Sequence, residues 1–209
     1  MKNITLDLSG SVTFVVTDGT NKYRITTSKA HVERVVEPAS TWPWDKDIRA
    51  ELARNDKCPG SLSNGWWKRK LSQIDGLTFH HTLSDSPHAT ARHYIHKGGG
   101  RPSIPYTIWV TQTGEVLLCL DLAEGCWHDH TGHKNTHLSI GLAGSLHKLR
   151  PPDVQLDAAA KVAIWAIQSN LFSIDKALGH MDYVQTVCPG WASKLSGHWK
   201  PLLYNRIRL

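Results

Sequence analysis

Three metal-binding side chains in two distant segments constrain this sequence more than any other feature. Residues 178–191, LGHMDYVQTVCPGW, contain His180 and Cys188, which are separated by seven residues. The FHHT run at residues 79–82 adds a further imidazole, from His80 or His81. Two imidazoles and one thiolate form a three-ligand set for zinc that leaves one coordination position open, as catalytic zinc sites do. We therefore expect a fold in which these two segments meet.

The two adjacent histidines compete for the same place in such a site. Successive side chains of a strand point to opposite faces, so only one of His80 and His81 can point toward the other ligands. A second Cys-Pro-Gly run begins at Cys58, but the residue eight positions before it is Ala50, whereas His180 stands eight positions before Cys188. This comparison indicates that Cys58 is an ordinary thiol.

The composition limits the classes of protein to which the chain can belong. It has 209 residues, of which 40% are hydrophobic and 20% are charged, enough for one domain with an appendage and unlike a disordered chain. The net charge of +6 favours anionic partners, either nucleic acid or cell-wall polymer. The sequence has no paired Cys-x-x-Cys, no helix-turn-helix signature and no concentrated basic stripe, and this argues against nucleic acid.

The N-terminus and the cysteines favour a protein made without an export signal. The apolar residues after Lys2 are interrupted by Asp7 and Ser9, so we expect no secretory signal and synthesis in the host cytoplasm. No apolar run reaches about eighteen residues, which predicts no membrane span. The four cysteines lack the spacing of a disulfide scaffold and are interpreted as thiols or metal ligands, with a Cys119–Cys126 disulfide left open.

The first part of the chain divides into an extension and a connector. Apolar and polar residues alternate from Val12 to Thr17, and the DGTN turn at residues 18–21 follows, so residues 1–40 are predicted to be a β-hairpin extension. Residues 41–75 are rich in tryptophan and proline and are interpreted as a connector, with a short helix predicted at 45–54. Its Trp66 and Trp67 are either a carbohydrate-stacking surface or an interior anchor.

The rest of the chain, residues 76–209, alternates predicted strands and helices. A strand over 77–79 delivers His80, and a helix that Asp153 can cap follows two prolines. The other expected elements are a helix at 86–96 and strands at 106–110, 116–120 and 138–143. Strands interspersed with helices predict an α/β fold with a central sheet and helices on its faces.

Four motifs in this region resemble one known family. They are the strand ending in His-x-Thr at residue 82, IPYTIWVTQTGEV at 104–116, NTHLSIGLAG at 135–144, and the pair GHMD and CPGW before residue 192. Their order resembles the zinc-dependent N-acetylmuramoyl-L-alanine amidases of the phage T7 lysozyme and peptidoglycan-recognition protein type. The resemblance covers roughly residues 76–191.

The resemblance carries specific implications. It implies a mixed β-sheet fold with residues 76–209 as the catalytic domain, and a zinc ion held by His80, His180 and Cys188. It also selects His80 over His81. The implied activity is hydrolysis of the amide that joins the muramyl lactyl group to L-alanine in peptidoglycan.

Two further residues match catalytic positions of the family. Tyr106 matches a tyrosine whose hydroxyl orients the water or stabilises the tetrahedral oxyanion, and the alternative is a half-buried strand tyrosine. Thr186 stands where the phage T7-type lysozymes carry lysine and where the peptidoglycan-recognition amidases often have threonine. Its role is a hydrogen bond to the oxyanion or that of a bystander.

A histidine-rich loop, residues 125–137, supplies the predicted substrate contacts. The family has a histidine five positions before its asparagine, which from Asn135 points to His130, and His128 is the rival because it follows a tryptophan. We expect the histidine to contact the glycan or lactyl part of the substrate, and Asn135 to contact substrate or to fix the loop. The alternatives for the histidines are stray metal binding or simple solvation.

The leading hypothesis is therefore a zinc amidase of phage or prophage origin, an endolysin, which reaches the wall through a separate pore. The first alternative is a peptidoglycan-binding module of the same fold without hydrolysis, a class that commonly lacks the cysteine ligand. The second is a basic zinc-containing nucleic-acid binder. The sequence leaves the oligomeric state open.

Overall fold

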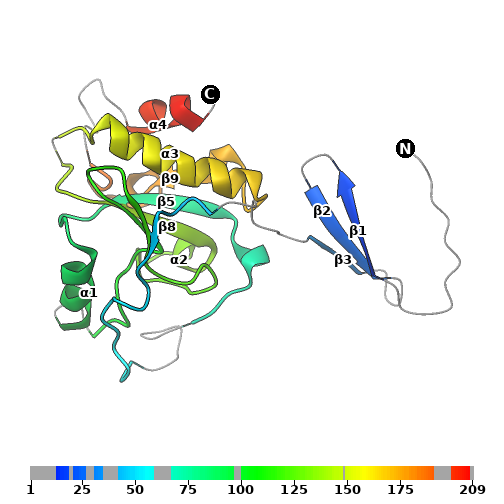
Figure 1. Ribbon diagram of the computed structural model, residues 1–209, viewed down its shortest axis with the longest axis horizontal. Helices are drawn as coiled ribbons and strands as arrows, with labels where there is room; N and C mark the ends of the chain where they lie inside the picture. Colours follow the sequence, from blue (N-terminus) through cyan, green and yellow to red (C-terminus); the bar gives the residue numbers. More distant parts are fainter. Residues whose placement is uncertain are drawn as a thin grey trace, which may run out of the picture.

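Six strands form a sheet in the order β4-β7-β6-β8-β5-β9. Figure 1 labels β8, β5 and β9 of this sheet, with helix α3 (Asp153–Gln168) beside them. The computed structural model describes residues 13–18, 21–26, 31–34, 42–58, 67–96, 100–147, 149–190 and 199–207. The strands of this sheet are β4 (Lys46–Asp47), β5 (Gly76–His81), β6 (Ile108–Val110), β7 (Val116–Leu118), β8 (His137–Leu142) and β9 (Ala177–Gly179).

The sheet is mixed. Strands β6, β8, β5 and β9 run parallel to one another, β7 is antiparallel to β6, and β4 at the edge is parallel to β7. The predicted α/β class with a central mixed sheet is confirmed. The carboxyl ends of β5 and β9 lie at the same edge, and this edge positions the candidate site.

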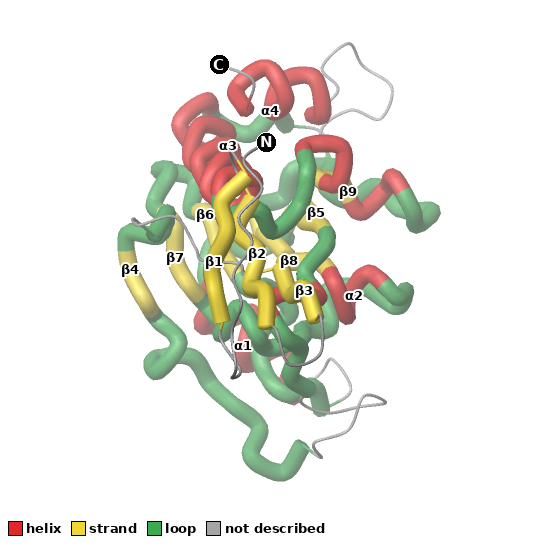
Figure 2. Tube along the Cα trace, turned by 90° about the vertical axis from the view of Figure 1, so that its right-hand side faces the viewer, coloured by secondary structure: helices red, strands yellow, loops and turns green. Residues whose placement is uncertain are grey.

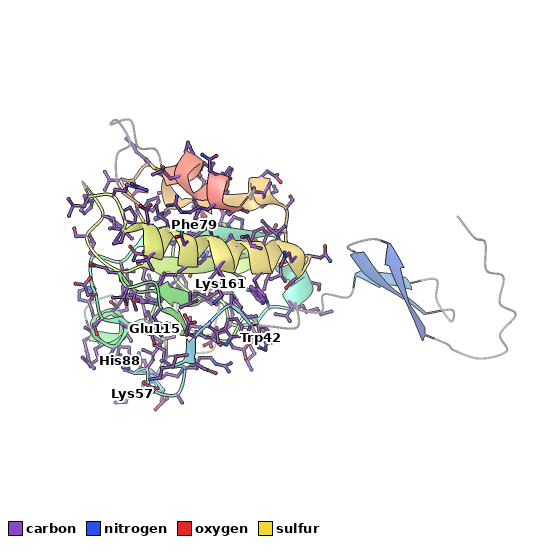
Figure 3. The ribbon with its side chains drawn as sticks, turned by 45° about the horizontal axis from the view of Figure 1, so that its top comes forward. Trp42, Lys57, Phe79, His88, Glu115 and Lys161 are labelled. Atoms are coloured by element: carbon purple, nitrogen blue, oxygen red, sulfur yellow. The ribbon has the colours of Figure 1, made fainter. Side chains whose placement is uncertain are left out.

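Successive side chains of the strands point to opposite faces of the sheet, so an apolar core lies on each face. Phe79 and Ile140 belong to the core beneath helix α3 (Asp153–Gln168), which helix α4 (Trp199–Ile207) also covers (Figure 3). Trp109 points to the opposite face and packs in a second core with Ala91 of helix α1 (Pro87–His96). The short helices are α2 (His133–Thr136), η1 (Leu71–Gln73), η2 (Ile174–Lys176) and η3 (His180–Asp182).

Helix α3 follows its predicted apolar spacing but not its predicted cap. Leu156 and Ala163 are fully buried at the expected helical interval. Pro152, not Asp153, is the N-cap, because its carbonyl accepts hydrogen bonds from the backbone of the first turn. Asp153 is the first helical residue and pairs with Arg150 and Arg206, so the predicted capping role of Asp153 is wrong.

The N-terminal hairpin prediction is confirmed. Strand β1 (Thr13–Asp18) pairs antiparallel with β2 (Asn21–Thr26), and Asp18 lies opposite Asn21 at the turn. A third strand, β3 (His31–Arg34), pairs with β2 and was not predicted. Figure 2 labels the three strands of this separate sheet.

Part of the predicted connector belongs to the main sheet. The helix predicted at residues 45–54 is wrong, because the backbone of this segment bonds to the free edge of β7: Asp45 N donates to Val116 O at 2.7 Å. Ile48, which follows β4, is buried. Trp67 is also buried and contacts Trp127 edge-on, as the interior-anchor alternative predicted, whereas Trp66 lies outside the described residues.

Two further expectations concern a disulfide between Cys119 and Cys126 and a membrane-spanning helix. All four cysteines are free thiols, so Cys119 and Cys126 form no disulfide. Within the described ranges, no helix combines the length and apolarity needed to cross a membrane.

A buried glutamine joins α3 to the sheet and predicts a stability change. Gln155 Nε2 donates to Val110 O and Ala143 O at 3.0 and 3.1 Å. Gln155→Leu removes both bonds, and we expect the free energy of unfolding to fall by about 2 kcal/mol, because a buried carbonyl loses its partner. Urea denaturation measures the change. Gln168→Leu, on an exposed position of the same helix, should change stability by less than about 0.5 kcal/mol, and an equal loss in both variants would contradict this account.

Candidate metal centre

Three side chains converge at the carboxyl ends of β5 and β9. The register pairs Phe79 of β5 with Gly179 of β9, so His80 and His180 are each the next residue along. Cys188 comes from the loop that follows η3. The two segments that the sequence placed far apart therefore meet.

The donor atoms of these residues form a compact cluster. One ligand atom from each of His80, His180 and Cys188 lies within 4.8 Å of the other two, and no other group of three or more such residues occurs in the described part of the chain. His80 Nδ1 is 3.5 Å from Cys188 Sγ, and the centroids of the His80 and His180 rings are 4.6 Å apart. His81 instead packs edge-on against His147. The geometry favours His80 over His81, as the resemblance implied.

The loop that carries Cys188 is held by its neighbours. Cys188 N donates to Thr186 Oγ1 at 3.2 Å. Gly190 has a φ of 91°, and a Cβ there would lie 2.2 Å from the Leu146 carbonyl oxygen. Only glycine allows this close approach, which brings the thiol to the sheet edge.

Burial sets the protonation states of the cluster. Desolvation lowers the pKa of His80 well below its ordinary value, and nearby histidines lower it further. Desolvation also lowers the pKa of His180, although Asp129 opposes this shift. The same effect raises the pKa of the Cys188 thiol to about 12. At neutral pH the protein alone therefore presents two neutral imidazoles and a protonated thiol.

Tyr106 lies beside the cluster. The centroids of the Tyr106 and His80 rings are 5.6 Å apart, and the Tyr106 hydroxyl is hydrogen-bonded to Tyr94. Burial raises the pKa of Tyr106 well above its ordinary value, so the hydroxyl stays neutral and able to donate. Thr186 is partly exposed, and its oxygen accepts the Cys188 amide proton described above.

The predicted substrate residues occupy different environments. His130 is exposed, and Asn135 is partly buried in α2. The side chain of His128 is fully buried. Its Nδ1 lies 3.1 Å from His80 Nε2, so His128 contacts a candidate ligand rather than the surface.

Two residues of the site escaped sequence reasoning. Asp129 is 3% exposed, and its Oδ2 lies 3.2 Å from His128 Nδ1 and 3.1 Å from the Tyr183 hydroxyl. The sequence signals were the position of Asp129 between His128 and His130 and that of Tyr183 in the run between His180 and Cys188. Asp182, two residues after His180, accepts a hydrogen bond from Gly179 N at 2.8 Å and so holds the turn after β9.

One pocket of the described structure lies away from the cluster. It has a volume of about 1190 Å³, and its lining includes Arg49, Arg54, Trp67 and Glu124 but none of the candidate ligands. Its walls carry both signs of charge.

Comparison with known proteins supplies the family. The model of the N-acetylmuramoyl-L-alanine amidase family matches residues 70–191, more than half of the chain. The chain belongs to this family. No curated protein sequence matches it.

Solved structures of the amidase and peptidoglycan-recognition type share the fold. The bumblebee peptidoglycan-recognition protein PGRP-SA has a TM-score of 0.56 at 17% identity over 70% of this chain and 91% of its own. The N-acetylmuramoyl-L-alanine amidase LysC from Clostridium intestinale has a TM-score of 0.54 at 19% identity over 68% and 95%. Drosophila PGRP-LB in complex with tracheal cytotoxin has a TM-score of 0.52 at 17% identity over 68% and 86%.

The protonation states predict how metal binding depends on pH. A thiolate is the form that ligates, so a divalent ion must displace the Cys188 proton, whereas the two neutral imidazoles release none. We expect about one proton released per zinc ion at pH 7, and an affinity that rises about tenfold per pH unit near neutrality. Titration calorimetry in buffers of different ionisation enthalpy measures the proton count. Release of no proton would contradict the assignment of a protonated thiol.

Proposed function

We propose that the chain is a zinc hydrolase that cleaves the amide between N-acetylmuramic acid and L-alanine in bacterial peptidoglycan. The observation that carries the proposal is the convergence of His80, His180 and Cys188 at one sheet edge, in a chain of the amidase family.

The donor set fits zinc. Imidazole nitrogen and thiolate sulfur are its usual protein ligands, and three protein ligands leave a position for water or a carbonyl oxygen. His80, His180 and Cys188 would hold the ion. When bound, zinc lowers the pKa of a coordinated water and polarises a substrate carbonyl, and amide hydrolysis needs both.

Two hydroxyl groups would serve the tetrahedral intermediate. Tyr106 is a neutral donor beside His80, so its proton can stabilise the oxyanion as negative charge develops. The Thr186 oxygen accepts the Cys188 amide proton, which leaves the hydroxyl proton for a second hydrogen bond. His130 and Asn135 are the proposed contacts to the glycan or lactyl part.

The fold shared with peptidoglycan-recognition proteins supports a second candidate function, which is binding of peptidoglycan without hydrolysis. PGRP-LB is a peptidoglycan-recognition protein that was solved with tracheal cytotoxin, and this chain shares its fold. Retention of Cys188 beside both histidines favours hydrolysis, since a binding module needs no metal ligands.

We extend the proposal to the biological setting of an endolysin of phage or prophage origin. The family match and the fold shared with LysC support a wall-degrading role. The protein would be made in the host cytoplasm and would reach the wall through a separate pore. Expression with and without a pore-forming protein tests this, and lysis should require the pore.

The central prediction concerns product formation. Purified protein incubated with peptidoglycan should release new L-alanine amino termini, and chelator or Cys188→Ser should reduce the rate at least 100-fold, because each removes the polarising metal. End-group analysis measures the product.

Cys58→Ser is the matched control, because Cys58 begins the second Cys-Pro-Gly run and lies outside the cluster. It should keep the rate within about twofold. Wall binding without release would favour the recognition module, and release that survives both chelator and Cys188→Ser would refute the zinc mechanism.

Gly141 tests the role of Tyr106. A Cβ at Gly141 would lie 2.8 Å from Thr82 Cγ2 and 2.9 Å from two ring atoms of Tyr106, so Gly141→Ala must displace the ring together with the Thr82 methyl group. We expect kcat to fall about 100-fold, the typical loss of an oxyanion donor, with zinc content unchanged. Gly132→Ala is the control, because a Cβ there meets no atom within 4 Å. Unchanged kcat in Gly141→Ala would argue against Tyr106.

A further inference from the structure

The pocket of about 1190 Å³ has no part in the proposed metal chemistry. Ten residues line it: eight precede residue 70, where the family match begins, and two, Asp121 and Glu124, lie within the matched range. The segment before the family match therefore forms most of this pocket. Its volume is that of a site for an organic ligand rather than for a single ion.

Backbone hydrogen bonds fix two sides of the pocket. On one side, Ile48 N donates to Leu118 O at 3.0 Å, which attaches the segment after β4 to β7. On the other side, Gly125 N donates to Trp67 O, also at 3.0 Å. Because these attachments hold the lining in place, a ligand would lose less free energy in ordering it.

Charged side chains of the pocket are paired with one another. Arg49 Nε and Nη2 donate to the Asp47 carboxylate at 2.6–3.0 Å, and Arg54 Nη2 donates to Glu124 Oε2 at 3.0 Å. A charged ligand would have to compete with these ion pairs and would meet a like charge beside each opposite one. A neutral ligand with hydroxyl groups meets neither obstacle, since a hydroxyl both donates and accepts.

Arg49 and Asp121 offer a place for such a hydroxyl. Arg49 Nη1 lies 3.6 Å from Asp121 Oδ2, which is longer than a hydrogen bond. One sugar hydroxyl can accept a proton from Nη1 and donate its own to Oδ2. Leu52 and Trp67 add apolar surface to the same lining, and this surface suits the C–H faces of a sugar ring.

The pocket and the metal cluster lie on the same face of the sheet. Leu52 of the lining shares one apolar core with Tyr106, whose ring lies beside His80. Trp67 meets Trp127 edge-on, with ring centroids 5.2 Å apart, and Trp127 is near the start of the histidine-rich loop. A polymer held at the cluster can therefore extend along this face to the pocket.

We propose that this pocket is a second subsite for the glycan strand of the bacterial wall, which binds an uncharged part of the polymer away from the bond that is cleaved. The inference rests on the proposed peptidoglycan substrate but not on zinc or on hydrolysis. It gives the residues before the family match a role in substrate binding. Two linked subsites also predict that the polymer binds more tightly than a small fragment.

Binding of a soluble oligosaccharide tests the proposal. A tetramer of N-acetylglucosamine, titrated into ¹⁵N-labelled protein, should shift the amide signals of Arg49 and Asp121 and the indole signal of Trp67. Arg49→Ala and Asp121→Ala should each weaken this binding about 10-fold or more, because each removes one partner of the bridging hydroxyl. Arg150→Ala is the control, since Arg150 is also an exposed arginine paired with an aspartate, and it lies outside the pocket. It should leave the affinity unchanged.

Hydrolysis of the wall supplies a second readout. Arg49→Ala should raise the KM for polymeric peptidoglycan about fivefold or more and leave kcat unchanged, because the pocket binds the polymer but does not touch the reacting bond. Turnover of a soluble muramyl dipeptide should be unchanged, because this fragment occupies only the metal cluster. A fall in kcat for both substrates would contradict a role confined to binding.

The outcomes decide the proposal separately from the function. Oligosaccharide shifts confined to the surroundings of His180 and Cys188, or wild-type affinity in both pocket variants, would overturn it. If a variant does not fold, the shifts in the wild-type protein decide alone. Tighter binding of a zwitterionic dipeptide than of the tetramer would make the pocket a peptide site, and equal binding of maltotetraose would overturn the assignment to the wall glycan. Binding of the tetramer at the pocket of a protein that cleaves nothing would support the subsite and refute only the proposed hydrolysis.

Discussion

The parallel pairing of β5 with β9 is the constraint on which the candidate site depends. The register that sets Phe79 opposite Gly179 brings His80 and His180 together at one edge of the sheet. Strand β5 also pairs along its whole length with β8, which holds it in the interior. The Cys188 loop then needs only to approach this edge, and Gly190 makes that approach possible. A shift of one residue would turn the His80 side chain to the other face of the sheet.

Around this edge, hydrogen bonds take the place of apolar packing. His80, His128, Asp129 and Tyr183 are linked at distances of 3.1–3.2 Å. Burying polar groups destabilises a fold unless they have partners, so each group of this chain restricts the orientation of the next. The same burial keeps the imidazoles neutral and the Tyr106 hydroxyl protonated. The structure thus prepares both the ligands and the hydroxyl donor before any metal or substrate binds.

The elements that sequence reasoning found are those with a strong local pattern. Strand β8 and helix α3 were predicted because their apolar residues recur at strand and helix spacing. Strands β4 and β9 were missed because they have two and three residues, and they exist only through backbone bonds to longer strands. The sequence at 45–54 favours a helix locally, but the free edge of β7 offers its backbone better partners.

The sequence by itself determined the chemistry available to this protein. It identified two imidazoles and a thiolate, singled out Cys188 over Cys58 by the histidine eight positions before it, and marked Tyr106 and the histidine-rich loop. Only the tertiary structure decided what each side chain touches: it buried His128 against His80, left His130 exposed and added Asp129 and Tyr183 behind them. The physical reason is that ligand chemistry belongs to a residue wherever it lies, whereas burial and hydrogen-bond partners arise from packing between segments distant in the chain.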